Sequence, residues 1–236
     1  MCYSNSSTST TQQLAERYGK LVPGKPTELT HYFASGFQFP NWQIITNDAV
    51  LQQMRWGLLP KWYGGANWME FAAKTLNARI ETCAEKASFK HLVQSNHCLI
   101  PSSGFFEWQT QGKTKIPYFI RAIQQPVFSI AGLYDTWLNP STGAFEQTFT
   151  MLTTAANQLM AEIHNAKQRM PLILTPDEEI GWLNGALTTS QVSDRTHIDL
   201  EAWEIDKKVL LGPLANTVQV SQRYCNNLAV QKGLFD

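Results

Sequence analysis

A central stretch of the sequence, residues 97–154, reads HCLIPSSGFFEWQTQGKTKIPYFIRAIQQPVFSIAGLYDTWLNPSTGAFEQTFTMLTT. It is rich in β-branched and aromatic residues, and glycine, proline and polar residues divide it into short runs. These runs are typical of β-strands, which we expect at HCLIP, GFFEWQ, YFIRA, VFSIAGLYDTW and TFTMLTT. The Gly-Lys pair in TQGKTK and the PSTG segment after Trp137 supply turns. The stretch therefore predicts a mainly antiparallel sheet.

The flanking sequence adds helices and a further hairpin. Helices are expected over residues 14–22, 84–95, 155–165 and 175–185, a hairpin over 42–59, strands at 171–175 and 217–221, a loop over 60–71, and an irregular end at 225–233. No repeat or low-complexity linker divides the chain. We expect an α+β fold: a single compact domain, residues 1–236, with a mainly antiparallel, barrel-like β-sheet and flanking helices.

The composition narrows the class of protein. Of the 236 residues 43% are hydrophobic and 16% charged, which fits a packed globule. Lys+Arg and Asp+Glu both number 19, so a nucleic-acid contact would need a local basic patch. No apolar run approaches the ~20 residues of a membrane span. The first residues lack the basic region followed by an apolar run that is typical of a signal peptide. The four cysteines and five histidines show no metal-binding spacing. We expect a cytoplasmic protein without metal or other cofactor, and without membrane contact.

Cys2 directly follows Met1. Methionine is removed efficiently when the second residue is small, and removal would leave an α-amine beside the thiol. Such an amine condenses with an aldehyde to a Schiff base, on which the thiol closes to a five-membered thiazolidine. An acyl group would instead be attacked by the thiol. Taken alone, Cys2 is better explained as an accident of the gene start.

Two further stretches carry groups that suit chemistry. In CLIPSSGFFEW, Glu107 lies between aromatic residues, either facing solvent or lining an apolar pocket where burial would raise its pKa and suit it to proton transfer. In NARIET, Asn77, Arg79 and Glu81 alternate, so all three can share one face of an extended segment. Asparagine offers an amide and arginine a phosphate clamp, although an exposed strand with an Arg–Glu pair is the common alternative.

Cationic residues follow two other elements. His164 ends an expected helix, and Arg169 lies shortly after it; a helix cap or a satisfied core histidine is the ordinary interpretation of His164. In RWGLLPKWYG, Lys61 and Trp62 stand in a glycine-rich loop. Interleaved cations and aromatic rings suit single-stranded nucleic acid, where bases stack and phosphates pair.

The order of these stretches is more specific than any one of them. Eight stretches follow one another in the chain: MC, WGLLPKW, LNARIET, CLIPSSGFFEW, IPYFI, AGLYDTW, FTMLTTAAN and IHNAKQRMPLIL. A ninth, VSQRYCNN, matches more weakly. The series resembles the SOS-response-associated peptidase (SRAP) family, also called abasic-site processing proteins. That resemblance implies a compact, mainly β domain with flanking helices, and a DNA-damage function.

The resemblance also implies a reaction. Family members crosslink covalently to abasic sites in single-stranded DNA through the amino-terminal cysteine, which Cys2 matches. Catalytic roles follow for Asn77, Glu107 and His164. DNA-binding roles fall to the residues that match the family's DNA contacts: Lys61, Trp62, Arg79 and Arg169. A monomer that is cytoplasmic, and nucleoid-associated when it acts on DNA, is expected, with weak lyase and self-processing peptidase activity.

Two departures from the family pattern affect this assignment. HYFASGFQFP replaces an early Tyr-Asn-x-x-Pro stretch, and NAKQ lengthens the link between His164 and Arg169. Three alternatives stay open: an amino-terminal-nucleophile amidohydrolase, a thiol peptidase with Cys2 and His164, and a lesion-binding module in which Cys2 is passive. Tyr3 argues against the amidohydrolase, in which glycine is expected at that position.

Overall fold

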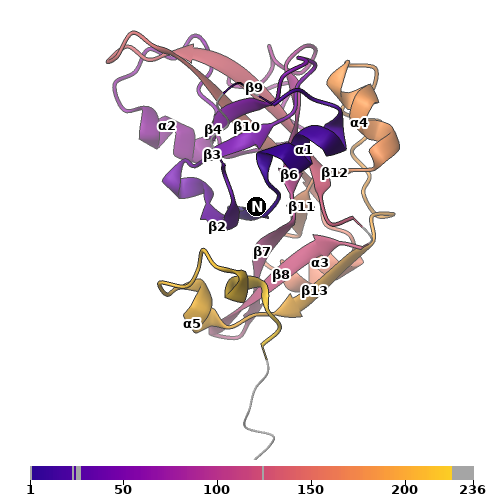
Figure 1. The fold of residues 1–236 in the computed structure, drawn as a ribbon. Coiled ribbons are helices and arrows are strands. Elements are labelled where there is room, and N and C mark those ends of the chain that lie inside the picture. Colours follow the sequence, from indigo (N-terminus) through magenta and orange to yellow (C-terminus); the bar gives the residue numbers. More distant parts are fainter. Residues whose placement is uncertain (1, 23, 25–27, 124, 225–236) are drawn as a thin grey trace, which may run out of the picture.

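Two β-sheets enclose the main hydrophobic core (Figure 1). The computed structural model describes residues 2–22, 24, 28–123 and 125–224. The first sheet runs in the order β13 (Leu200–Glu204), β8 (Thr114–Ala122), β7 (Gly104–Gln111), β1 (Ser4–Ser7) and β2 (His31–Ser35). The second runs β12 (Ile173–Leu174), β9 (Phe128–Leu138), β10 (Phe145–Ala155), β4 (Gln52–Trp56) and β3 (Asn41–Ile44), with β5 (Asn77–Arg79) and β11 (Arg169–Pro171) on β10 and β6 (His97–Ser102) on β9.

Most strand pairs are antiparallel, as the sequence predicts. Parallel pairing occurs where β10 meets β4 and β5. The core draws side chains from both sheets, among them Trp42 and Trp56 from one and Phe105 and Ile120 from the other. The prediction of an α+β fold around a barrel-like, mainly antiparallel sheet is therefore confirmed.

The expected turns of the central stretch are present. Gln111 pairs with Thr114, which leaves Gly112 and Lys113 as a two-residue turn between β7 and β8. Gly112 has a φ of 58°, a left-handed conformation that glycine adopts without steric cost. The turn sets the register of β7, and so decides which face of the sheet Glu107 occupies.

The helices lie at the periphery of the strands (Figure 1). They are α1 (Thr11–Tyr18), α2 (Trp68–Lys74), α3 (Gln158–Ile163), α4 (Pro176–Leu183) and α5 (Lys207–Leu210), with short 3-10 helices at Gly36–Gln38 and Val218–Ser221. Thr10 and Thr175 begin α1 and α4 with capping boxes, as their sequences favour. None of the described helices is long and apolar enough to cross a membrane.

Four sequence expectations need correction or addition. Residues 84–95 form successive turns rather than a helix, because their backbone bonds alternate between three- and four-residue spacing, as at Phe89 and Lys90. The expected strand at 217–221 is a short 3-10 helix whose Val220 is buried. The expected loop 60–71 already contains the start of α2, and β1, β2 and β13 were not predicted. The irregular segment expected at 225–233 lies outside the described residues.

Candidate functional site

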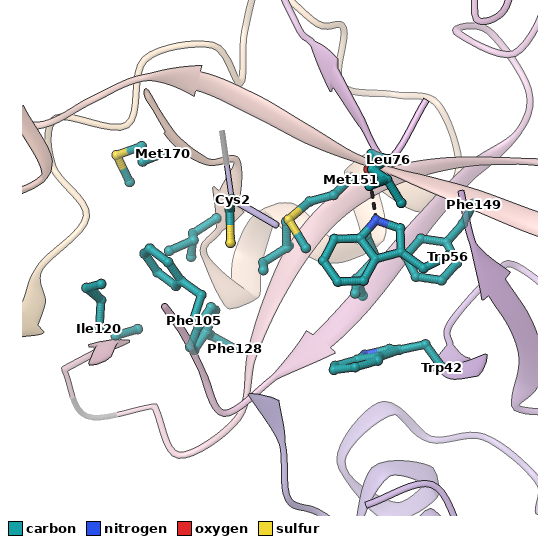
Figure 2. Packing of buried hydrophobic residues seen from close by; sticks show 14 of the residues in the cluster. Cys2, Trp42, Trp56, Leu76, Phe105, Ile120, Phe128, Phe149, Met151 and Met170 are labelled. Carbon is teal, nitrogen blue, oxygen red and sulfur yellow. Dashed lines mark hydrogen bonds between the residues drawn. The ribbon is translucent and has the colours of Figure 1, made fainter. Parts of the chain in front are cut away.

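The Cys2 thiol is buried in the main core. Its side chain is fully enclosed, and Sγ donates a hydrogen bond to the Ser4 carbonyl at 3.3 Å. Figure 2 draws the thiol among Phe105, Met151 and Met170 of the same cluster. Burial raises the pKa of the Cys2 thiol far above its ordinary value, and the charge of Glu107 adds to the increase. The sulfur is therefore a protonated thiol at neutral pH.

Pairing of β1 with β7 brings Cys2 close to Glu107. Ser4 lies opposite Phe106, so the residues just before Ser4 run beside the next residues of β7. Glu107 is only 5% exposed, and in the described part of the chain its Oε1 has no hydrogen-bond partner. Burial raises the pKa of Glu107 to about 8, against the opposing effects of the Trp108 backbone N–H and Lys167. Glu107 is therefore mostly a neutral acid at pH 7.

His164 caps the end of α3 and faces the same carboxyl. Its Nδ1 lies 2.9 Å from the Arg169 carbonyl oxygen and 3.9 Å from Glu107 Oε1. A carbonyl only accepts, so Nδ1 carries the hydrogen in the neutral ring. Burial lowers the pKa of His164. The spacing would permit an ion pair with Glu107, but burial favours the neutral form of both groups and we assign them as neutral.

Asn77 presents unused hydrogen-bonding groups. It is 8% exposed, and both its Oδ1 and its Nδ2 are buried without a partner among the residues that the structure describes. Leaving such atoms unpaired costs about 1–3 kcal/mol each, so an unpaired buried amide indicates a ligand. Its backbone pairs with Met151, a member of the cluster that contains Cys2. Arg79 follows on the same face of β5 and is exposed.

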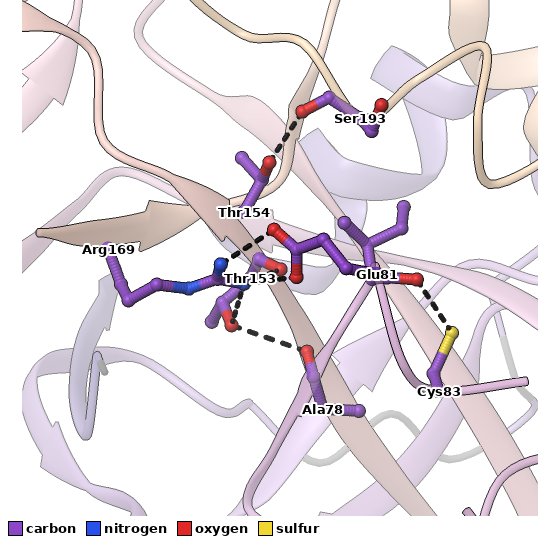
Figure 3. A network of polar contacts seen from close by, with 8 residues as sticks. Ala78, Glu81, Cys83, Thr153, Thr154, Arg169 and Ser193 are labelled. Atoms are coloured by element: carbon purple, nitrogen blue, oxygen red, sulfur yellow. Dashed lines mark hydrogen bonds and ion pairs between the residues drawn. The ribbon is translucent and has the colours of Figure 1, made fainter. Parts of the chain in front are cut away.

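Arg169 is held by protein groups. Its guanidinium makes two hydrogen bonds to Glu81, at 2.6 and 2.9 Å, and one to the Thr153 carbonyl at 2.6 Å (Figure 3). It is 8% exposed. Glu81 thus pairs with Arg169, and the contact of Arg169 with DNA stays a prediction that requires this pair to open or share its donors.

Lys61 and Trp62 lie on a turn after β4, outside the cluster around Cys2. Both side chains are exposed, Trp62 by 53%, and the Trp62 ring meets Phe71 edge-on with centroids 6.0 Å apart. The structure thus brings Cys2, Glu107 and His164 together, with Asn77 on the neighbouring β5. The exposed aromatic and cation suit a surface that receives an extended ligand.

Sequence reasoning missed the part of Tyr3 in this site. Its ring contacts Phe37 with centroids 4.9 Å apart, and burial together with the charge of Glu107 raises the pKa of its hydroxyl. The only signal was its position beside Cys2. In the described chain no three His, Cys, Asp or Glu side chains gather as a metal site would require.

The buried carboxyl predicts a pH-dependent stability effect. Between pH 4.5 and about 8 the folded state holds a proton on Glu107 that the unfolded state has lost, so the unfolding free energy falls as pH rises through this window. Glu107→Gln removes this penalty and should raise the unfolding free energy by roughly 3 kcal/mol at pH 7. Urea denaturation at pH 4 and pH 7 measures it. Equal gains at both pH values would contradict the assignment of a neutral Glu107.

The sequence of this chain is similar to those of known proteins. A profile described as SOS response associated peptidase (SRAP) matches residues 1–210. Abasic site processing protein YoqW of Bacillus subtilis (strain 168) is 38% identical over 181 residues, covering 72% of this chain and 78% of that protein. Abasic site processing protein HMCES of Xenopus tropicalis is 34% identical over 158 residues, covering 59% of this chain and 46% of that protein.

The fold has a solved counterpart as well. A crystal structure of a protein from Bacteroides thetaiotaomicron has a TM-score of 0.86 and 35% sequence identity, and the match covers 95% of this chain and 100% of that chain. From the family profile, the related sequences and this structure, the chain belongs to the SOS response associated peptidase (SRAP) family.

Proposed function

We propose that this protein processes abasic sites in DNA by capturing them covalently on Cys2 once Met1 has been removed. The observation that carries the proposal is the grouping of Cys2 with a buried, neutral Glu107 and with His164. The substrate class is supported by relatives that are named abasic site processing proteins. The ring-opened abasic sugar carries an aldehyde, the electrophile that an aminothiol traps.

The reaction starts with the freed α-amine of Cys2. The amine adds to C1′ of the sugar aldehyde, and the resulting hydroxyl leaves as water after accepting the proton of Glu107. The thiol then adds to the imine carbon, and its proton passes to the Glu107 carboxylate. One water is lost, two bonds to C1′ form, and Glu107 ends as it began. A carboxyl with a pKa of about 8 suits both transfers, since it gives and regains a proton near neutral pH.

A competing path explains the weak lyase activity that we propose. From the imine, loss of a proton at C2′ leads to β-elimination, in which the C3′–O bond breaks and the 3′ phosphate leaves. The neutral His164, 3.9 Å from Glu107, is a base suited to that proton. Closure of the thiazolidine consumes the imine and so protects the strand. The peptidase activity in this proposal is limited to exposing Cys2.

Asn77 is proposed to hold the captured sugar through its unpaired amide. Asn77→Ala should lower the crosslinking rate about 10- to 100-fold without lowering the unfolding free energy, because no protein hydrogen bond is lost and two unpaired buried amide atoms are removed. Single-turnover crosslinking and urea denaturation measure the two effects.

Asn139 provides the matched control. It is equally buried, but its amide bonds to Glu146 and to the Ser141 backbone. Asn139→Ala should therefore lose stability and keep the crosslinking rate. A loss of stability in Asn77→Ala without a loss of rate would contradict the role of Asn77.

Single-stranded DNA is the proposed partner, bound by a monomer. Exposed Trp62 can stack on a base, while Lys61 and Arg79 are exposed cations suited to phosphates. Action on DNA would place the protein at the nucleoid.

The proposal is tested with Met-free protein and oligonucleotides that carry a uracil converted to an abasic site by uracil glycosylase. An adduct that survives denaturation should form on the single strand, more slowly on the duplex, and not at all with intact uracil or a tetrahydrofuran analogue that lacks the aldehyde. Absence of the adduct on the single strand would end the proposal.

A further inference from the structure

The Lys61–Trp62 turn is fixed by side chains that the chemistry above does not use. The Tyr63 N–H donates to the Pro60 carbonyl at 2.8 Å, so Lys61 and Trp62 are the two central residues of a β-turn. The backbone around such a turn is held weakly when it is hydrogen-bonded only to water. Here the Leu59 N–H, the Lys61 N–H and the Tyr63 carbonyl are bonded to side chains of β9 and β10.

Asp135 on β9 provides the central contact. It is 4% exposed, and its Oδ2 accepts the Lys61 N–H at 2.8 Å and the His91 Nε2–H at 2.8 Å. Its Oδ1 accepts the Thr136 N–H at 2.9 Å. The buried Asp135 carboxylate accepts all three hydrogen bonds only while the Lys61 N–H stays in place. Asp135 therefore fixes the Lys61 backbone and, through it, the turn.

Two more hydrogen bonds hold the backbone two residues before and two residues after Lys61. The Leu59 N–H donates to Thr148 Oγ1 at 2.8 Å, and Trp137 Nε1–H donates to the Tyr63 carbonyl at 2.6 Å. Thr148 lies opposite Asp135 in the β9–β10 pair. Side chains on one face of the β9–β10 hairpin therefore hydrogen-bond to the backbone of residues 59, 61 and 63, while the side chains of Lys61 and Trp62 stay exposed.

We propose that Asp135, supported by His91, is a positioning residue that holds the Lys61–Trp62 turn ready for single-stranded DNA; this inference rests on the proposed function. Neither group touches the DNA. His91 belongs to the turns that follow β5, so the contact also links the two segments that carry Arg79 and Lys61. A turn fixed before binding loses less conformational entropy when it binds.

The experiment measures binding of a single-stranded oligonucleotide with a tetrahydrofuran site, which cannot crosslink. Asp135→Asn should raise Kd about tenfold, within the range expected for losing one stacked base. The crosslinking rate at saturating abasic DNA should change less than about twofold, since the chemistry at Cys2 is untouched. Thr136→Ala, an exposed neighbour whose backbone bond to Asp135 survives, is the matched control and should bind as wild type does.

A double-mutant cycle separates positioning from a general loss of structure. In a Lys61→Ala/Trp62→Ala background, Asp135→Asn should have less than about a twofold effect on Kd, because the groups it positions are gone. His91→Ala repeats the test should Asp135→Asn fail to fold. Equal effects in both backgrounds, or an unchanged Kd in the wild-type background, would overturn the inference alone. An unchanged Kd for the Lys61→Ala/Trp62→Ala protein would overturn the proposed DNA contact as well, whereas the Cys2 crosslinking assay tests the proposed function separately.

Discussion

Replacing Cys2 with alanine should abolish the denaturation-resistant adduct with abasic single-stranded DNA. Alanine keeps the α-amine, so the imine still forms, but without a thiol the ring cannot close and the imine hydrolyses during denaturation. Cys2→Ser gives a similar result, since a hydroxyl is a weaker nucleophile toward the imine. Borohydride should rescue a stable adduct in both variants by reducing the imine. Denaturing gels with and without borohydride measure the loss and the rescue.

Cys98 supplies a matched control for this prediction. It is as fully buried as Cys2 and belongs to the same hydrophobic cluster. Cys98→Ala should cost stability, by about 1 kcal/mol for a small cavity, and retain the adduct. A Cys2→Ala protein that forms the adduct at the wild-type rate without borohydride would show that another residue is the nucleophile.

The second large effect is expected for Glu107→Gln. Loss of a positioned general acid typically lowers a rate about 10²- to 10⁴-fold, and glutamine fills the same space without a transferable proton. The pKa of about 8 also fixes a pH signature. Because the α-amine must be neutral to attack, the wild-type rate of imine formation should pass through a maximum near about pH 8 and fall above it as Glu107 loses its proton, and the variant should lack that fall.

Glu179 distinguishes this role from ordinary burial of a carboxylate. It is 6% exposed, close to the 5% of Glu107, but it accepts hydrogen bonds from Arg17 and Ser129. Glu179→Gln should weaken that network and lower stability without changing the crosslinking rate. Glu107→Gln should do the reverse, raising stability at pH 7 and slowing the reaction. A wild-type rate and pH profile in Glu107→Gln would contradict the proton-transfer role.

The strands of the central stretch were predictable from the sequence because their signals are local, although the sequence did not show that they divide between two sheets. Alternation and turn residues define β7, β8, β9 and β10, and the Gly112 turn fixes one register. The expected helix at 84–95 failed because helical composition alone does not outweigh tertiary packing: Phe89 and Leu92 are buried in a chain of turns. The parallel pairing of β5 with β10 joins residues more than seventy positions apart, and no local pattern encodes it.

In the candidate site, too, the sequence identified residues but not the contacts that form only in the folded chain. Family motifs named Cys2, Asn77, Glu107 and His164, but their neutral, buried state is a property of the assembled core. Arg169 illustrates the limit most clearly. Its sequence position suggested a phosphate contact, whereas its bonds to Glu81 and Thr153 depend on strands that meet only in the folded chain. The contact between Asp135 and the Lys61 backbone could not be predicted either, since a hydrogen bond from a side chain to a distant backbone group leaves no pattern in the sequence.

The mass of the adduct tests the central claim most directly. Met-free protein is allowed to react with an abasic oligonucleotide, the DNA is digested with nuclease, and the crosslinked peptide is weighed and fragmented. Ring closure on Cys2 predicts the summed masses of peptide and sugar fragment less one water, with the added mass on the first residue and no gain of hydrogen after borohydride. A modification on an internal residue, or a first-residue adduct that gains two hydrogens with borohydride, would contradict thiazolidine formation by the Cys2 aminothiol.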